Sequence, residues 1–234
     1  MESNPLLNRF LQAFPSQFLL RLAERQKALY QQSLALSFNE SWSRTEGFSV
    51  LPANRRALWE SEARKTAVEC GLKTFDLAHA GDNCSFVIVK ADSLLLTVHY
   101  VDGPNQLVRE AESRKQHAGV NRWLGYYADE RLLTAPIPKL DSKPIYLYLL
   151  HGARFPSTVN ENLLIDETTC FLRVAIPAND TSKYLFNWSV QELLQSYSLA
   201  GENRNMSALV EDKAQPRKKS VVSGSTKTAA GKVG

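Results

Sequence analysis

The side chains best suited to chemistry in this chain are cations within one predicted helix, residues 105–124. They are Arg109, Arg114, Lys115, His117 and Arg122. In a helix, Arg114, His117 and Asn121 share one face, because they are three and seven residues apart. Such a face is suited to contacts with the phosphates of a nucleic acid. The alternative is a solvated face whose cations pair with Glu110 and Glu112.

A second group of cations lies close to the end of the chain. Of the 28 Lys and Arg residues, six lie in 213–234, where there is no acidic residue, so 22 remain against 24 acidic residues in 1–212. The run Arg217, Lys218 and Lys219 can neutralise about three phosphates, which gives weak, salt-sensitive affinity without sequence preference. The same run can instead fold onto an acidic protein partner or improve solubility.

Other reactive side chains form weaker patterns. His79 with Asp82, or His99, could ligate a metal or act as a base, and polar turn or surface roles are the alternative. Cys84 could be a nucleophile with His99 across a hairpin, whereas a buried inert thiol is the more common state of such a cysteine. We therefore expect no cofactor and no metal site, and we favour a non-catalytic protein over an enzyme.

The composition is typical of a folded globular protein. The chain has 234 residues, of which 44% are hydrophobic, enough to build a sizeable core. Cys70, Cys84 and Cys170 are odd in number and form no CxxC pair, which argues against a disulfide framework and a structural zinc site. No signal-peptide pattern and no run of about 18 apolar residues is found. We therefore expect a cytoplasmic location, reduced thiols and no membrane contact.

A sheet must position these side chains, and the clearest strand pattern is 85–101. A two-residue turn at Asp92 and Ser93 joins two apolar runs there. It pairs Ala91 with Leu94, Val89 with Leu96, and Val87 with Val98. Six apolar side chains then share one face of a central hairpin, so this face needs a covering layer.

Further strands and helices are predicted around this hairpin. The strands are 72–78, 145–150 and 170–176. The helices are a long one that begins near Ser16, then 55–70, 105–124, and a last one opened by a capping box at Ser189. A loop is predicted over 37–53, and Glu60 and Arg64 are expected to form a surface ion pair. The fold class is therefore α+β, with an antiparallel or mixed β-sheet around the hairpin, flanked by helices.

The order helix, strand, hairpin, helix, strand resembles, in topology only, the core of the PD-(D/E)XK nucleases. The resemblance implies a metal-binding acid on the second strand and a D/E-x-K motif on the third, which together hold Mg²⁺ and activate water. Residues 97–99 are Thr-Val-His instead, and the nearest acids, Asp76, Asp82 and Asp92, lie in another strand or in turns. An inactive descendant that kept binding would explain the same features.

Three segments and three functions follow from these patterns. We expect an N-terminal helical segment (1–36), an α+β domain (37–201) and a disordered basic tail (202–234). The favoured function is a non-catalytic intracellular regulatory protein that contacts nucleic acid through the basic helix and the tail. The alternatives are an inhibitor or antitoxin-like protein that binds a protein partner, and a metal-dependent nuclease. The amphipathic N-terminal helix packs on the main domain or forms a homodimer or partner interface.

Overall fold

The computed structural model describes residues 4–38, 43–78, 85–124, 143–153 and 170–199. Its chain divides into two compact units, Met1–Tyr197 and Ser198–Gly234. The fold below is that of the first unit. The predicted tail, 202–234, lies outside the described residues.

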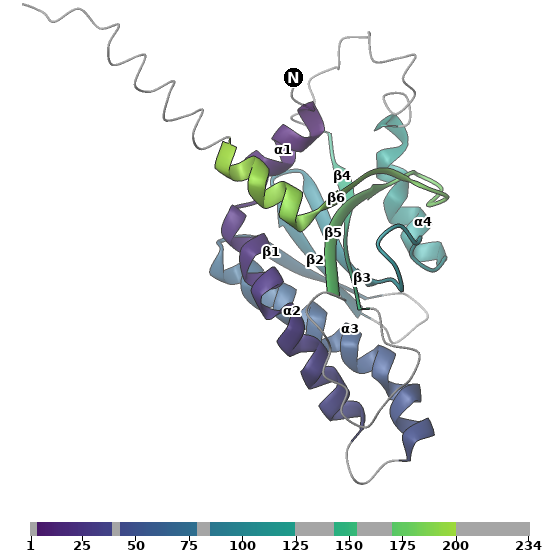
Figure 1. Cartoon of the computed structure of the whole chain (residues 1–234). Coiled ribbons are helices and arrows are strands. Elements are labelled where there is room, and N and C mark those ends of the chain that lie inside the picture. Colours follow the sequence, from purple (N-terminus) through teal and green to yellow (C-terminus); the bar gives the residue numbers. More distant parts are fainter. Residues whose placement is uncertain (1–3, 39–42, 79–84, 125–142, 154–169, 200–234) are drawn as a thin grey trace, which may run out of the picture. The chain divides into compact units, whose positions relative to one another are not determined.

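Within the described residues, six strands form one mixed sheet in the order β1-β2-β3-β4-β5-β6 (Figure 1). The strands are β1 (Lys73–Ala78), β2 (Ser85–Ala91), β3 (Leu94–Tyr100), β4 (Ile145–Ala153), β5 (Cys170–Pro177) and β6 (Tyr184–Ser189). All neighbouring pairs are antiparallel except β3 and β4, which are parallel. Parallel strands need a crossover connection, and here it contains the helix α4 (Glu112–Ala118) and the 3₁₀ helix η1 (Gly119–Leu124). The predicted α+β class is confirmed.

The predicted central hairpin is confirmed in position and register. Ala91 is opposite Leu94 and Val89 is opposite Leu96. Asp92 has a φ of 50°, which a tight two-residue turn requires. The six apolar side chains expected on one face are all buried in one hydrophobic cluster.

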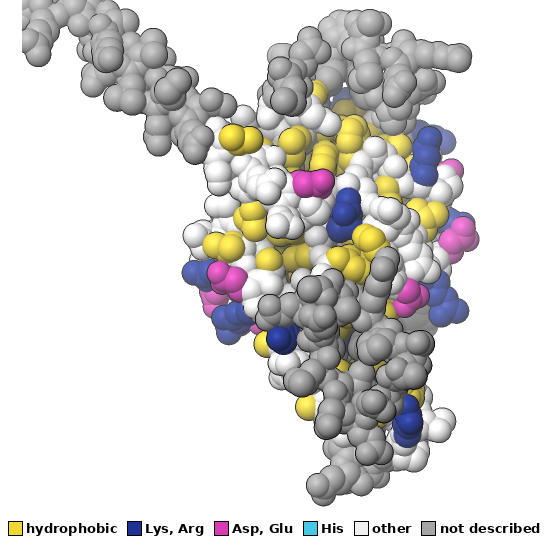
Figure 2. Space-filling view, in the orientation of Figure 1, with side chains coloured by type: hydrophobic (Ala, Val, Ile, Leu, Met, Phe, Trp, Pro, Cys, Tyr) yellow, Lys and Arg dark blue, Asp and Glu magenta, His cyan; other side chains and the backbone are white. Residues whose placement is uncertain are grey.

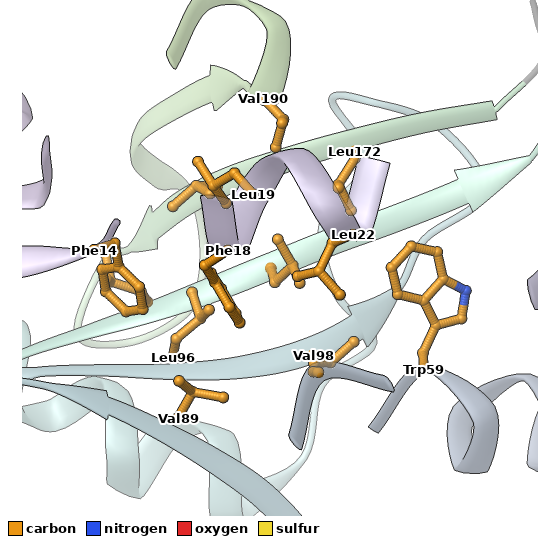
Figure 3. Close-up of a cluster of buried hydrophobic side chains, with 14 of the residues drawn as sticks. Phe14, Phe18, Leu19, Leu22, Trp59, Val89, Leu96, Val98, Leu172 and Val190 are labelled. Carbon is orange, nitrogen blue, oxygen red and sulfur yellow. The ribbon is translucent and has the colours of Figure 1, made fainter. Parts of the chain in front are cut away.

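Four of the described helices cover that face of the sheet: α1 (Pro5–Ala13), α2 (Ser16–Ser37), α3 (Arg44–Glu69) and a last helix at 190–199 (Figure 1). Figure 3 shows Phe18 and Leu22 of α2 directed toward Leu96 and Val98 of β3. Trp59 of α3 belongs to the same cluster. The apolar stripes of the N-terminal helices and the inner face of the sheet therefore form one core.

The helix α3 is longer than predicted, and the predicted loop over 37–53 is wrong from residue 44 onward. A capping box starts the helix, because Ser43 Oγ accepts a hydrogen bond from the Glu46 amide at 3.3 Å and Glu46 accepts one from the Ser43 amide at 2.7 Å. Pro52 lies inside the helix, where tertiary packing offsets its poor helix propensity. Gly47 approaches the Phe38 ring so closely that an added Cβ would lie 2.5 Å from it.

The helix α4 and η1 cover part of the opposite face, and the predicted helix over 105–124 is too long. Residues 105–111 are not helical. Side chains of β6, a strand that the sequence did not predict, satisfy the backbone of this segment instead. The Tyr184 hydroxyl accepts from the Val108 amide at 3.1 Å and donates to the Gln106 carbonyl at 2.9 Å, and Asn187 donates to the Pro104 carbonyl at 3.1 Å.

The last helix begins as predicted. The Ser189 amide donates to Glu192 at 2.7 Å, and the Glu192 amide donates to Ser189 Oγ at 3.1 Å, which completes the capping box. Among the helices of the described ranges, none has a stretch long and apolar enough to cross a membrane.

Candidate anion-binding cleft

A cleft of about 470 Å³ lies between α3 and α4 at the end of β3. The helix α3 contributes Arg56 and Glu60 to its lining, and α4 contributes Arg114 and His117. Residue Arg109 comes from the non-helical segment before α4. Among the described residues, three arginines and one glutamate therefore line the cleft, an excess of two formal positive charges before the histidines are counted.

Arg114 is the central cation of this cleft. It is half-buried, and its guanidinium donates a hydrogen bond to the backbone carbonyl of Arg109. No carboxylate of the described residues forms an ion pair with it. Burial lowers the pKa of Arg114, and the positive charges of Arg56 and Arg109 lower it further, against the opposite effect of two tyrosines. Because an arginine stays charged in proteins, this cost is not relieved by loss of a proton.

The single carboxylate in the described lining is already paired. Arg56 Nε lies 2.8 Å from Glu60 Oε1, one helical turn away, and the Glu60 side chain is only 15% exposed. Burial raises the pKa of Glu60, whereas the hydrogen bond from Arg56 acts in the opposite direction. The negative charge of Glu60 therefore neutralises the positive charge of Arg56. Arg109 and Arg114 supply the excess positive charge of the cleft.

His99 is a neutral histidine in the lining of the cleft. Its pKa lies well below the usual value, first because of burial and then because Arg114, His151 and Arg56 repel a proton. The neutral ring lies 2.8 Å, Nε2 to Oγ1, from Thr97, whose hydroxyl donates to Tyr146 at 2.9 Å. Arg114 and Arg56 therefore add a positive potential at this ring to the effect of burial.

His117 forms the side of the cleft toward β2. Its Nδ1 lies 2.5 Å from the Ser113 carbonyl, so Nδ1 carries a hydrogen and Nε2 is left for a ligand. The ring meets Phe86 edge-on at 5.4 Å and Tyr146 at 5.5 Å. Aromatic rings thus adjoin the cationic part of the cleft.

The structure brings together three of the predicted nucleic-acid-binding residues, Arg109, Arg114 and His117, and His99, a candidate ligand or base, lies in the same lining. Lys115 instead pairs with Glu110 at 3.3 Å, as the solvated-face alternative predicted for this cation. Arg122 is exposed and does not line the cleft. The remaining candidates lie outside the described residues: Arg217, Lys218 and Lys219 of the tail, and His79, Asp82 and Cys84.

Asn121, expected on the face of Arg114 and His117, is buried instead. Its side-chain amide donates to the carbonyls of Tyr146 and Pro177, both at 2.9 Å, and its carbonyl oxygen accepts from the Tyr146 amide at 2.8 Å. The helical spacing fails here because the chain changes to a 3₁₀ helix at Gly119. Asn121 therefore fixes the start of β4 and the end of β5.

Arg56 and Glu60 are the charged lining residues that the sequence did not reveal. Glu60 was expected to pair with Arg64, but Arg64 forms a bidentate pair with Asp76 of β1. The i, i+4 spacing of Arg56 and Glu60 was visible in the sequence. Their place above the cleft depends on how α3 packs on the sheet, which spacing alone does not determine.

On the face seen in Figure 2, several Lys and Arg side chains lie close to Asp and Glu side chains. In the described part of the chain, opposite charges also pair across α2 and α3, as in Arg25 with Glu62 at 2.6 Å. Charge is therefore more balanced along α2 and α3 than in the lining of the cleft.

The positions that the nuclease resemblance implies hold no acid in the described strands. Strand β2 carries no carboxylate, and β3 carries Thr97 and His99. Asp76 is engaged by Arg64, and Asp92 lies in the hairpin turn. No group of three His, Cys, Asp or Glu able to hold a metal ion occurs among the residues with described positions. Comparison of the chain with protein-family models, with curated proteins and with solved structures gave no match.

Proposed function

We propose that this protein is a non-catalytic, regulatory binding protein that holds a phosphate group of a nucleic acid in the cleft between α3 and α4. The observation that carries the proposal is the half-buried guanidinium of Arg114, which has no carboxylate partner in the described part of the chain. A desolvated charge without a counter-charge is costly. A phosphate supplies the counter-charge in a geometry that matches the guanidinium.

The surroundings of Arg114 support an anionic ligand. Arg109 and Arg56 lie near enough to lower its pKa, and Arg114 and Arg56 add to the effect of burial in lowering the pKa of His99. Nucleic acid is the favoured source of the phosphate because the chain has a second group of cations in its tail. A polymer with many phosphates can engage both groups, whereas a small anion engages one.

The test is binding of the full chain to a fluorescein-labelled strand of about 20 nucleotides, followed by fluorescence anisotropy across a salt series. Arg114→Gln should lower the affinity about ten- to a hundredfold, because this is the loss expected when one charge-assisted hydrogen bond to the ligand is removed. It should also reduce the salt slope by about 0.7, because one phosphate contact is lost from a single strand.

Arg122→Gln is the matched control, because it removes an exposed arginine from the same segment without touching the cleft. Its affinity should equal that of the unchanged protein. An equal loss in both variants would mean that the cleft has no special part in binding. Absence of binding to any oligonucleotide would overturn the proposal and direct the search to protein partners.

A second variant separates the tail from the cleft. Replacing Arg217, Lys218 and Lys219 by Gln in the full chain should reduce the salt slope by about 2. The effect of Arg114→Gln should persist in that background, because the two groups of cations contact different phosphates. Gel analysis of the same samples with Mg²⁺ tests the nuclease alternative, and cleavage of the strand would contradict a purely binding function.

A further inference from the structure

An exposed apolar strip on β1 continues the cleft along the outer face of the sheet, beside the buried Ile88 of β2. Phe75 and Leu77 of β1 are 46% and 37% exposed, although both are large and apolar. Leu77 is opposite Phe86, and Phe75 is opposite Ile88, so their side chains share the face that α4 partly covers. Phe86 itself lines the cleft. The strip therefore runs from the cleft toward the edge strand of the sheet.

Two lysines lie at the far end of this strip. Lys73 and Lys90 are exposed, directly opposite each other in the β1–β2 register, and on the same face as Phe75. Like charges placed opposite in a sheet repel and destabilise it. Neither lysine forms an ion pair with a carboxylate of the described residues. An anion bound between them would relieve this repulsion.

The strip, from Phe86 at the cleft to Lys90, is long enough for a polymer. Phe86 and Lys90 are four residues apart on β2, which corresponds to about 13 Å along a strand. A stacked nucleic acid strand rises about 3.4 Å per nucleotide, so the strip has the length of about four nucleotides. A single small anion cannot reach both ends.

We infer that this strip binds a single-stranded nucleic acid, with its phosphates at the cleft arginines and at Lys73 and Lys90, and with a base stacked on Phe75. The inference rests on the proposed function and deepens it by naming the form of nucleic acid. A cationic path beside exposed aromatic rings is the arrangement that holds single strands without sequence preference. Bases in a duplex are stacked on one another, so a duplex offers the strip no base faces.

The experiment compares a labelled single strand of about 20 nucleotides, its duplex and an abasic strand of the same length, all with the full chain. The single strand should bind more tightly than the duplex. Phe75→Leu keeps an apolar side chain but removes the ring, and it should weaken single-strand binding between about fivefold and a hundredfold. Phe75→Trp should retain the affinity, and the abasic strand should not respond to either substitution.

Phe48→Leu is the matched control, since Phe48 of α3 is 44% exposed and does not line the cleft. The double change Lys73→Gln and Lys90→Gln should lower the salt slope by about 1.4 for the single strand. Its control is Lys65→Gln with Lys183→Gln, two exposed lysines that lie off the strip.

The outcomes separate this inference from the proposed function. If Arg114→Gln weakens binding but Phe75→Leu leaves the single strand unaffected, the strip is not a base platform and the cleft still binds phosphate. If the unchanged protein binds duplex and single strand with equal affinity, the inference about the strip is also wrong, and the proposal for the cleft remains. If none of the three oligonucleotides binds, the proposed function fails first.

Discussion

The two faces of the sheet are built from different kinds of side chain. The face toward α2 and α3 is filled with aliphatic and aromatic residues such as Phe18, Leu96 and Val174, all fully buried. The face toward α4 has a smaller buried cluster, with Leu150 and Ala175, carries polar groups such as Thr97, and ends in an exposed strip and a cationic cleft. The contrast indicates that one face supplies most of the stability, while the other can hold polar and charged groups for binding.

The largest expected effect is on stability at the helix-covered face. Phe18→Ala removes a fully buried ring at the centre of that core (Figure 3) and should lower the free energy of unfolding by about 3–5 kcal/mol. Phe75→Ala, at the outer face, should change it by about 0.5 kcal/mol or less. Urea unfolding of both variants measures the difference. Equal losses would show that the two faces contribute alike.

The side chain of Asn121 links η1, on the outer face, to β4 and β5. Asn121→Ala leaves three backbone groups of β4 and β5 without a hydrogen-bond partner in a fully buried place. The free energy of unfolding should fall by about 2–4 kcal/mol, since each buried group left unpaired costs about 1–3 kcal/mol and neighbouring losses are not additive. Asn105→Ala removes an exposed asparagine and should have no effect in the same urea titration.

Most of the sheet could be predicted because its cues are local. Alternating apolar residues around Asp92 and Ser93 determine both the hairpin and its register, and the run from Ile145 to Leu150 is apolar enough to identify a buried strand. Strand β6 was missed because all its side chains are half-buried and it lies directly before a strong helix start. Such a strand is stabilised by its neighbour β5 rather than by its own pattern.

The cleft could be predicted only in part, because its lining comes from segments far apart in sequence. The cationic character of the segment containing Arg114 was evident from composition. The helix expected there is shortened by Tyr184 and Asn187, which bind its backbone from more than 70 residues away. Arg56 and Glu60 reach the cleft through packing of α3, and no sequence spacing encodes that packing. Sequence spacing and composition therefore identify Arg114 as a candidate but not the residues from other segments that line the cleft with it.

One histidine on each face of the sheet makes the free energy of unfolding depend on pH. Burial lowers the pKa of His151, which stacks on Trp59 at the helix-covered face, and the pKa of His99 at the outer face. Because the unfolded chain binds protons near pH 6.5 and the folded chain does not, stability is fully present above that pH and is lost as the pH falls below it.

The measurement is urea unfolding between about pH 7.5 and pH 5. Each histidine should contribute a slope of at most about 1.4 kcal/mol per pH unit below pH 6.5. His151→Gln and His99→Gln should each reduce the slope by one such contribution, and the double variant should remove both. A slope that is unchanged in both single variants would mean that other groups titrate in this range.

The smallest expected effect concerns Asp76, the described acid nearest to a nuclease-like position. Its carboxylate accepts a bidentate pair of hydrogen bonds from Arg64, which lowers its pKa, and both side chains are largely exposed. Exposed ion pairs contribute little, so Asp76→Asn should leave the urea midpoint nearly unchanged. Binding of a single strand should also persist, because Asp76 faces α3 and not the strip or the cleft. If the unchanged protein cleaves a strand with Mg²⁺ and this variant does not, catalysis belongs to the helix-covered side of β1. The helix-covered face would then carry function as well as stability.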